Sequence, residues 1–195
     1  MTTAGRFIKR AMDIVVAAAI LLVGWPILAI LAILIRCDSP GPVLFRQERA
    51  GRGMQPFTLY KFRTLRADAD PFGTSPRRPD DPRLTRIGRV LRETSFDELP
   101  QLWNVLRGEM SLVGPRPLYM SQARAFTPRQ RRRLDVRPGL TGLAQIQGRG
   151  EVPHEDKLEI DVRYVEQANL RLDLKILWAS LAFPFRRKEA YQKWH

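Results

Sequence analysis

The residues best suited to chemistry in this chain are two adjacent carboxylic acids, Asp97 and Glu98. Pro100 is poorly tolerated beyond the first turn of a helix, so the helix that carries Leu102 is expected to begin near Asp97, with Ser95 or Asp97 as its cap. The unpaired amides and the dipole at a helix N-terminus stabilise ionised carboxylates. Both acids are therefore predicted to be carboxylates at neutral pH without a base to deprotonate them.

The two acids are expected to have separate roles, because adjacent helical positions diverge by about 100° and cannot share one proton. One carboxylate can attack phosphorus and form an acyl phosphate. The other can bind Mg²⁺, which prefers few protein carboxylates together with substrate phosphates. The alternative is that Asp97 and Glu98 only favour the start of a helix, and for an isolated pair that is the better interpretation.

Two loops rich in Gly and Pro follow the acids, and each contains arginine. The first places Arg116 between Pro115 and Pro117, and the second, over residues 136–149, contains Arg137 and Arg149. Guanidinium groups match phosphate oxygens, and a rigid loop avoids the entropic cost of ordering. Taken singly such loops are commonly just turns, but beside two acids they favour recognition of a diphosphate.

An apolar segment over residues 14–35 comes before all of these features. At about 1.5 Å per residue it is roughly 33 Å long, enough to cross a bilayer. Pro26 lies at its middle and predicts a kink. Basic residues flank it on both sides: Arg6, Lys9, Arg10 and Arg36. Because cytoplasmic flanks are normally the basic ones, this favours a helix that enters the membrane, bends and returns, and a kinked single-pass anchor remains the alternative.

The charge of the chain predicts an anionic partner. Lys and Arg number 33 against 20 Asp and Glu, a formal net charge of +13. Beside a membrane anchor this indicates anionic lipid head groups or phosphorylated substrates. No nucleic acid partner is expected, since no base-reading helix, zinc spacing or stacking motif is present. The division expected is a membrane segment over residues 1–38 and one catalytic domain over residues 39–195.

The elements that must position these residues follow from local patterns. Two runs, 42–49 and 55–62, predict a hairpin, and residues 66–82 a loop that could be a lid. Helices are expected around Ile87, over 99–106, and over 118–134 with a new start capped by Thr127. The arginine run 129–133 is interpreted as a solvated face.

The last third of the chain is predicted to be helical. Leu158, Val162 and Val165 share one helix face. Residues 172–185 are apolar, contain Trp178 and end in a basic run, which is typical of a helix lying among lipid head groups. A core helix with a basic tail is the alternative.

Several motifs in the same order resemble the bacterial sugar transferases, also called monotopic phosphoglycosyl transferases, in their minimal single-domain form. They are Lys9-Arg-Ala-Met-Asp13, Tyr60-Lys-Phe-Arg-Thr64, Asp97-Glu98, Leu112-Val-Gly-Pro-Arg-Pro117, Arg137-Pro-Gly-Leu-Thr-Gly142 and Leu172-Asp-Leu-Lys-Ile176. The resemblance covers nearly the whole chain. It implies a mainly helical α+β fold with a re-entrant membrane helix broken at Pro26, amphipathic interfacial helices and a small β-hairpin.

The resemblance also implies a reaction. Asp97 would attack the β-phosphate of a nucleotide diphosphate sugar, usually a UDP-sugar, expel UMP, and pass the sugar phosphate on to polyprenyl phosphate at the cytoplasmic face of the bacterial inner membrane. Glu98 would then be the Mg²⁺ ligand. Candidate contacts to the donor are Lys61, Arg63, Arg92, Pro115, Arg116, Pro117, Arg137 and Arg149.

Two other function classes stay open at this point. A phosphotransferase that makes phospholipids normally has several spans and an Asp-rich helical signature, which this chain lacks. A non-catalytic, basic adaptor at the membrane surface would tolerate loss of Glu98 and show no Mg²⁺ dependence. The sequence also leaves open the sugar and whether the chain works as a homodimer.

Overall fold

The computed structural model describes all residues except 71–72, 74–75, 77, 148–151 and 182–195. Its helices are α1 (Thr3–Asp38), α2 (Arg86–Thr94), α3 (Gln101–Arg107), α4 (Met120–Arg124), α5 (Pro128–Arg131), α6 (Leu143–Gln147), α7 (His154–Gln167) and α8 (Leu170–Leu181). Three short 3₁₀ helices are η1 (Arg52–Met54), η2 (Phe96–Glu98) and η3 (Arg132–Asp135). The strands are β1 (Leu44–Ala50), β2 (Pro56–Phe62), β3 (Ser111–Val113) and β4 (Gly139–Thr141). The predicted mainly helical α+β class is confirmed.

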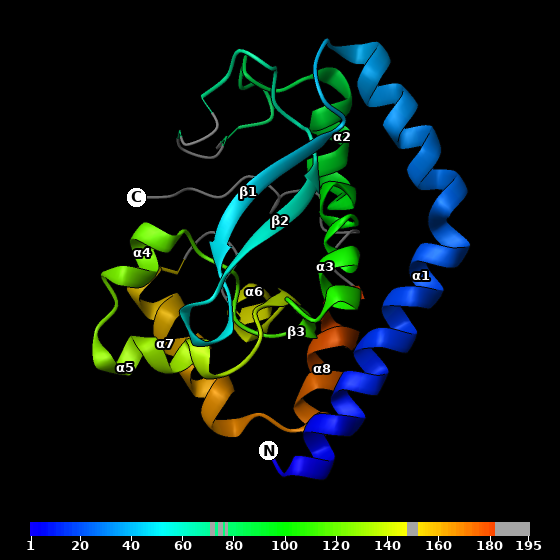
Figure 1. Ribbon diagram of the computed structural model, residues 1–195. Coiled ribbons are helices and arrows are strands. Elements are labelled where there is room, and N and C mark those ends of the chain that lie inside the picture. Colours follow the sequence, from blue (N-terminus) through cyan, green and yellow to red (C-terminus); the bar gives the residue numbers. More distant parts are fainter. Residues whose placement is uncertain (71–72, 74–75, 77, 148–151, 182–195) are drawn as a thin grey trace.

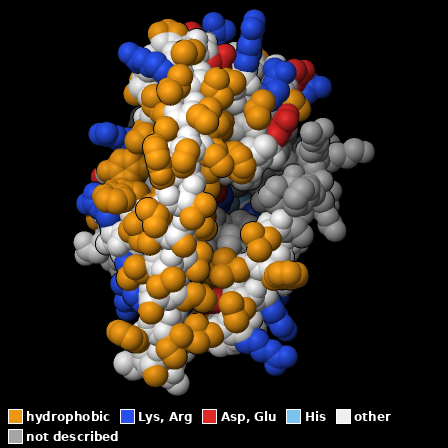
Figure 2. Space-filling model, turned by 90° about the vertical axis from the view of Figure 1, so that its right-hand side faces the viewer, with side chains coloured by type: hydrophobic (Ala, Val, Ile, Leu, Met, Phe, Trp, Pro, Cys, Tyr) orange, Lys and Arg blue, Asp and Glu red, His pale blue; other side chains and the backbone are white. Residues whose placement is uncertain are grey.

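Helix α1 lies along one edge of the molecule, and its axis changes direction about half-way along (Figure 1). It contains Pro26 and is assigned as one continuous helix through that residue. Most of its apolar side chains face outward, including Val23 and Trp25, which are 79% and 63% exposed. Figure 2 shows these apolar side chains along the whole helix. By length and composition α1 could cross a membrane.

The N-terminal part of α1 is attached to the body by buried charges. Lys9 Nζ lies 2.8 Å from Asp173 Oδ2 on α8, and Tyr164 donates a 2.7 Å hydrogen bond to the other oxygen of Asp173. Asp13, 1% exposed, accepts a bond from the Leu112 amide in the middle of β3. A buried charge is tolerated when it is paired, so this network defines where α1, α8 and β3 meet.

Both ends of α1 contact the same body. Near the first end, Arg10 donates to the carbonyls of Val105 and Leu106, which lie in the last turn of α3 where a cation is favoured. At the other end, Asp38 accepts a bond from the Ile87 amide in the first turn of α2. The middle of α1 is therefore the part that bends away from the body (Figure 1).

The predicted hairpin is confirmed as β1 and β2, an antiparallel pair in register from Leu44 opposite Phe62 to Ala50 opposite Pro56. The turn η1 joins the strands, and Gly53 and Met54 have positive φ angles there. Along β1 the side chain of Gln47 is buried, whereas those of Arg46 and Glu48 are exposed. One face of the hairpin therefore packs on the body, and Figure 1 shows it crossing the molecule beside α3.

Asn104 on α3 joins that helix to the hairpin. Its side chain is 0% exposed and accepts a bond from the Tyr60 amide. It also donates to the Thr58 carbonyl and to Glu109, both at 2.7 Å. Buried polar groups cost free energy unless they are bonded, so these contacts fix α3 against β2 in one register. Sequence reasoning missed this residue.

Replacing Asn104 by Ala is expected to lower the free energy of unfolding by about 2–4 kcal/mol, since three hydrogen bonds of a fully buried side chain are lost. Chemical denaturation of the purified chain measures this. Asn169→Ala is the matched control, because Asn169 forms its side-chain bonds at an exposed position and should lose only about 1 kcal/mol as a cap of α8. If Asn104→Ala and Asn169→Ala unfolded at the same denaturant concentration, the assigned role of Asn104 would be contradicted.

Strands β3 and β4 form a short parallel pair, Ser111 beside Gly139 and Val113 beside Thr141. Three glycines allow the loop after β3 and the segment around β4 to pack with their backbones in contact. A Cβ atom added to Gly114 would lie 2.5 Å from the Arg137 carbonyl oxygen, and one on Gly142 would lie 2.2 Å from the Gly114 oxygen. This glycine seam (Gly114, Gly139 and Gly142) holds the loop after β3 in place.

The region predicted as one interrupted helix over 118–134 divides into α4, α5 and η3. Thr127 caps α5 as expected, with its hydroxyl accepting from the Gln130 amide. The interpretation of the arginine run as a solvated face is wrong for Arg133, which is 2% exposed and paired with Asp161 on α7. Arg129 and Arg132 do face solvent, in ion pairs with Glu159 and Glu166.

The last two helices have the predicted faces. Leu158 and Val162 of α7 are buried, and Val165 packs against the core. In α8, Ile176 is 0% exposed, whereas Trp178 and Leu181 are 79% and 68% exposed. Helix α8 thus has one face in the core and one apolar outer face, and its position among lipid head groups stays a prediction. The basic run at 186–188 lies outside the described residues.

Candidate active site

Asp97 and Glu98 lie in η2, the tight connection between α2 and α3. Ser95 begins this connection with a φ angle of 60°, a left-handed conformation that non-glycine residues rarely adopt. The prediction that α3 begins near Asp97 is wrong, because the helix begins at Gln101 after Pro100, and no side chain caps the start of η2 or of α3. The two acids therefore lie in the tight turn between α2 and α3 and not in the first turn of a helix.

The two carboxylates lie in different surroundings. Asp97 is buried, at 8% exposed. Glu98 Oε1 accepts two charge-assisted bonds, from Lys61 Nζ at 2.7 Å and from Arg116 Nη2 at 3.0 Å. Lys61 comes from the end of β2, and Arg116 from the loop after β3. Three separate segments therefore meet at Glu98.

These surroundings separate the acidities of the pair. Burial raises the pKa of Asp97 to about 6, an effect that the charge of Lys61 opposes and that of Glu98 increases. Burial alone would raise the pKa of Glu98 too, but the charges and bonds of Lys61 and Arg116 outweigh it, so that pKa lies well below its usual range. Both pKa values lie below 7, in agreement with the expectation that both acids are carboxylates at neutral pH, but the helix-dipole argument does not account for the raised pKa of Asp97.

Arg92, on the last turn of α2, completes the cationic side of the site. Its Nε donates to the Thr64 hydroxyl at 3.1 Å. Its charge lowers the pKa of Asp97, so it lies within electrostatic range of that carboxylate. Sequence reasoning named Lys61, Arg92 and Arg116, and the structure brings all three to the acids.

The loop that bears Arg116 is rigid. Pro115 and Pro117 are buried on either side of it, while the side chain of Arg116 is 47% exposed. The Pro115 carbonyl accepts from the Gly139 amide at 2.9 Å. The buried Arg133 donates to the Arg116 carbonyl at 2.7 Å. Arg116 is thus positioned before any ligand arrives.

Comparison with known proteins agrees with this arrangement. The family model of bacterial sugar transferases matches residues 4–187, nearly all of the chain. The chain belongs to the bacterial sugar transferase family. The resemblance noted from the motifs is thereby confirmed over the same region that contains the acids and their cations.

Three relatives show how far the similarity extends. The chain is 46% identical to the uncharacterized sugar transferase EpsL of Bacillus subtilis (strain 168), over 87% of this chain and 83% of the relative. It is 41% identical to the UDP-glucose:undecaprenyl-phosphate glucose-1-phosphate transferase of Caulobacter vibrioides, over 94% of this chain and 72% of that enzyme. The enzyme of the same name from Escherichia coli (strain K12) is also 41% identical over 95% of this chain, which spans only 42% of its length.

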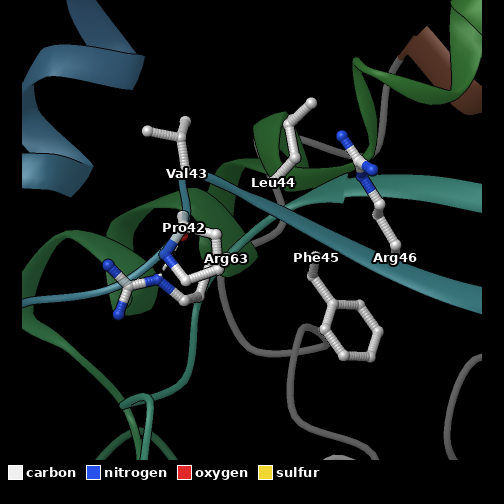
Figure 3. Close-up of a pocket in the computed structure, with 6 residues that line it drawn as sticks. All are labelled: Pro42, Val43, Leu44, Phe45, Arg46 and Arg63. Atoms are coloured by element: carbon white, nitrogen blue, oxygen red, sulfur yellow. Dashed lines mark hydrogen bonds between the residues drawn. The ribbon is translucent and has the colours of Figure 1, made fainter.

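Other candidate residues of this sugar transferase lie elsewhere. The Arg63 guanidinium bonds to the Ser39 hydroxyl and to the carbonyls of Ser39, Pro40 and Pro42. Figure 3 shows it turned toward Pro42, beside an open cavity of about 620 Å³ lined mainly by apolar atoms. Arg63 therefore fastens the turn between α1 and β1.

Arg137 is also used within the fold. Its Nε donates to the Gly108 carbonyl at 2.7 Å, just beyond α3. Burial and the charges of Arg10 and Arg52 lower its pKa, and neither Asp97 nor Glu98 affects that pKa. Arg149 lies outside the described residues, and its predicted role stays a prediction.

Sequence reasoning missed a further arginine of the site, Arg49 on β1. The charges of Arg116 and Glu98 both affect its pKa, so it lies near that pair. The alternation along β1 could have revealed it, because Arg49 is two residues from the buried Gln47 and shares its face. None of the motifs that carry the family resemblance includes this strand position.

Proposed function

We propose that this chain transfers a sugar 1-phosphate from a nucleotide diphosphate sugar, a UDP-sugar, to polyprenyl phosphate by a ping-pong reaction through Asp97. The observation that supports it most is the division of labour between the two acids. Asp97 is buried and bonds to no cation among the described residues, whereas Glu98 binds Lys61 and Arg116. A carboxylate that is not held in an ion pair is available as a nucleophile.

The reaction balances in two steps. A carboxylate oxygen of Asp97 attacks the β-phosphorus, the bond from that phosphorus to the bridging oxygen breaks, and UMP leaves. An oxygen of polyprenyl phosphate then attacks the same phosphorus, which frees Asp97 and gives a polyprenyl-diphosphate-linked sugar. Arg92, Arg116 and Lys61 lie where negative charge increases on the phosphate oxygens, and fixed cations stabilise such a transition state.

The residues present fit a single Mg²⁺ bound with the substrate. The described residues contain no group of three or more metal-ligating side chains. Glu98 is ionised, and both of its bonds fall on Oε1, which leaves Oε2 to ligate a metal. Mg²⁺ commonly uses one or two carboxylates and completes its shell with phosphates and water. Bound there, Mg²⁺ would supply positive charge to the diphosphate.

We propose further that residues 1–38 enter and leave the bilayer on one side, the cytoplasmic face of the inner membrane, with residues 39–195 as the catalytic part. The support is that Arg10 and Asp38, near the two ends of α1, bind the same body. The apolar outer faces of α1 and α8 would lie against lipid. The basic surface would then meet anionic lipid head groups.

The test is UMP release by the purified full chain, with Mg²⁺ and a short polyprenyl phosphate, from a panel of UDP-sugars that begins with UDP-glucose. Release with one or two sugars would establish the reaction and name the donor. A ping-pong reaction also predicts exchange of labelled UMP into the UDP-sugar without any acceptor. No release from any donor would overturn the proposal, and release without exchange would overturn the Asp97 intermediate.

The rate of the first step is expected to fall about tenfold per pH unit below pH 6, because a nucleophile must be ionised. The pKa of Asp97 is about 6, so lowering the pH through that value protonates it. Glu98 stays ionised over the same range because its pKa is lowered. Single-turnover UMP release between pH 4.5 and 8 measures the profile, and a flat profile would contradict the assignment.

A further inference from the structure

Arg49 has no assigned role, yet it lies beside the centre of the site. Its guanidinium stacks on the ring of Tyr119, with Cζ 3.7 Å from the ring centroid. It donates to the side chain of Gln47 and, at 3.5 Å, to the Pro117 carbonyl. Stacking on an aromatic ring holds a guanidinium flat and leaves its edge free for planar bonding.

The charge of Arg49 has no carboxylate partner in the part of the chain that is described. None of the ion pairs there includes it, and its Nε atom is buried without a hydrogen-bond partner. Burial is the main cause that lowers the pKa of Arg49. A partly buried cation without a counter-charge is costly, so an arginine held in this state is suited to an anionic ligand.

The charges of the whole site support the same conclusion. Three cations act on Asp97, namely Lys61, Arg92 and Arg116, and the charge of Glu98 also acts on a fourth, Arg49. The site therefore has an excess of two positive charges when both acids are ionised. A diphosphate joined to a sugar and a nucleoside has one negative charge on each phosphate, so this excess of cations favours its binding.

The position of Arg49 relative to Asp97 indicates which phosphate it would bind. Arg116 donates at 3.0 Å to Glu98, the residue next to Asp97. Arg49 instead donates to Gln47 and to the carbonyl of Pro117, the residue after Arg116, and forms no ion pair with either acid among the described residues. Arg116 is thus the nearer arginine to the nucleophile, and Arg49 is the farther one.

We propose that Arg49 binds the phosphate of the donor that leaves with the nucleoside, while Arg116 and Arg92 bind the phosphate that Asp97 attacks. This inference rests on the proposed function, since it assumes a nucleotide diphosphate donor. Tyr119 is then a positioning residue, because it acts through the guanidinium of Arg49.

The test is binding of UMP and UDP to the full chain in detergent with Mg²⁺, measured by calorimetry for the wild type and for Arg49→Gln. UMP retains the leaving phosphate, so its affinity is expected to fall about 10- to 100-fold, which is the loss of charge-assisted bonds. UDP affinity should fall by a similar factor. Arg49→Lys keeps the positive charge but lacks the planar guanidinium, so its loss of UMP affinity should be intermediate.

Arg46→Gln is the matched control. Arg46 lies on the same strand, also stacks on a tyrosine, and points to the opposite, exposed face. Its UMP affinity should equal that of the wild type. Unchanged UMP and UDP affinity in Arg49→Gln would overturn the inference, and a loss for UDP alone would overturn the choice of phosphate.

Two further outcomes separate this inference from others. If the wild type binds neither UMP nor UDP, the proposed donor class fails and the inference fails with it. Arg49→Gln and Arg49→Lys could both lower the thermal midpoint and reduce the affinity for uridine as much as that for UMP. In that case Arg49 only supports the Pro117 loop, and the inference is overturned. A wild-type midpoint and unchanged uridine binding would support a direct phosphate contact.

Discussion

Asp97→Asn is expected to reduce turnover by at least about 10⁴-fold, since asparagine has the shape of the nucleophile without its charge. UMP release and UMP exchange should be lost together, because both require the bond from Asp97 to phosphorus. Both are measured on purified protein with saturating donor. Retention of either reaction at the wild-type rate would remove Asp97 as the nucleophile.

The same variant should fold at least as well as the wild type. The pKa of Asp97 in the folded chain is about 6, raised by burial from 3.8. Folding therefore favours the protonated acid, and the stability cost of its charge increases as the pH rises through this interval and is complete at pH 7. The thermal midpoint of Asp97→Asn at pH 7 should equal or exceed that of the wild type. A lower midpoint would show that the loss of turnover has a structural component.

Glu98→Gln is expected to reduce turnover by about 10²- to 10³-fold, for two reasons. Lys61 and Arg116 share its Oε1 atom, and without that charge the two cations repel each other. The proposed Mg²⁺ ligand is lost as well, so raising the Mg²⁺ concentration should not restore the rate. Steady-state rates over a range of Mg²⁺ concentrations measure both effects.

The matched control is Glu159→Gln. Glu159 also binds an arginine, Arg129, but at an exposed position on α7. Exposed ion pairs contribute little, so this variant should keep its rate to within about twofold. Removal of the Glu98 charge should also lower the pKa of Asp97 and shift the acidic limb of the pH profile downward. Full activity of Glu98→Gln would instead match the adaptor hypothesis.

Much of the architecture could be predicted from local patterns. The hairpin, the Thr127 cap and the buried face of α7 follow from alternation, capping and helical spacing, which depend on neighbours in the chain. The acids and Arg116 were identified because their motifs resemble a family. These features require no knowledge of long-range packing.

The electrostatics of the site could not be predicted in the same way. The raised pKa of Asp97 depends on burial by segments far along the chain, and a helix-dipole argument cannot include it. Among the arginines of the run 129–133, only contact with Asp161 distinguishes the buried Arg133. Arg63 and Arg137 lie in motifs of the family, yet their bonds are to backbone carbonyls. Sequence motifs do not distinguish residues that bind substrate from residues that stabilise the fold.

The glycine seam limits how this enzyme could be redesigned for another sugar. A Cβ atom on Gly139 would lie 2.1 Å from the Gly114 nitrogen, and backbone atoms cannot move aside as a flexible side chain can. A mutagenesis library should therefore leave Gly114, Gly139 and Gly142 unchanged, because any replacement would displace the Arg116 loop and abolish activity whatever the donor. Diversity is better placed on exposed side chains around the site, where new donors can be selected without loss of the catalytic frame.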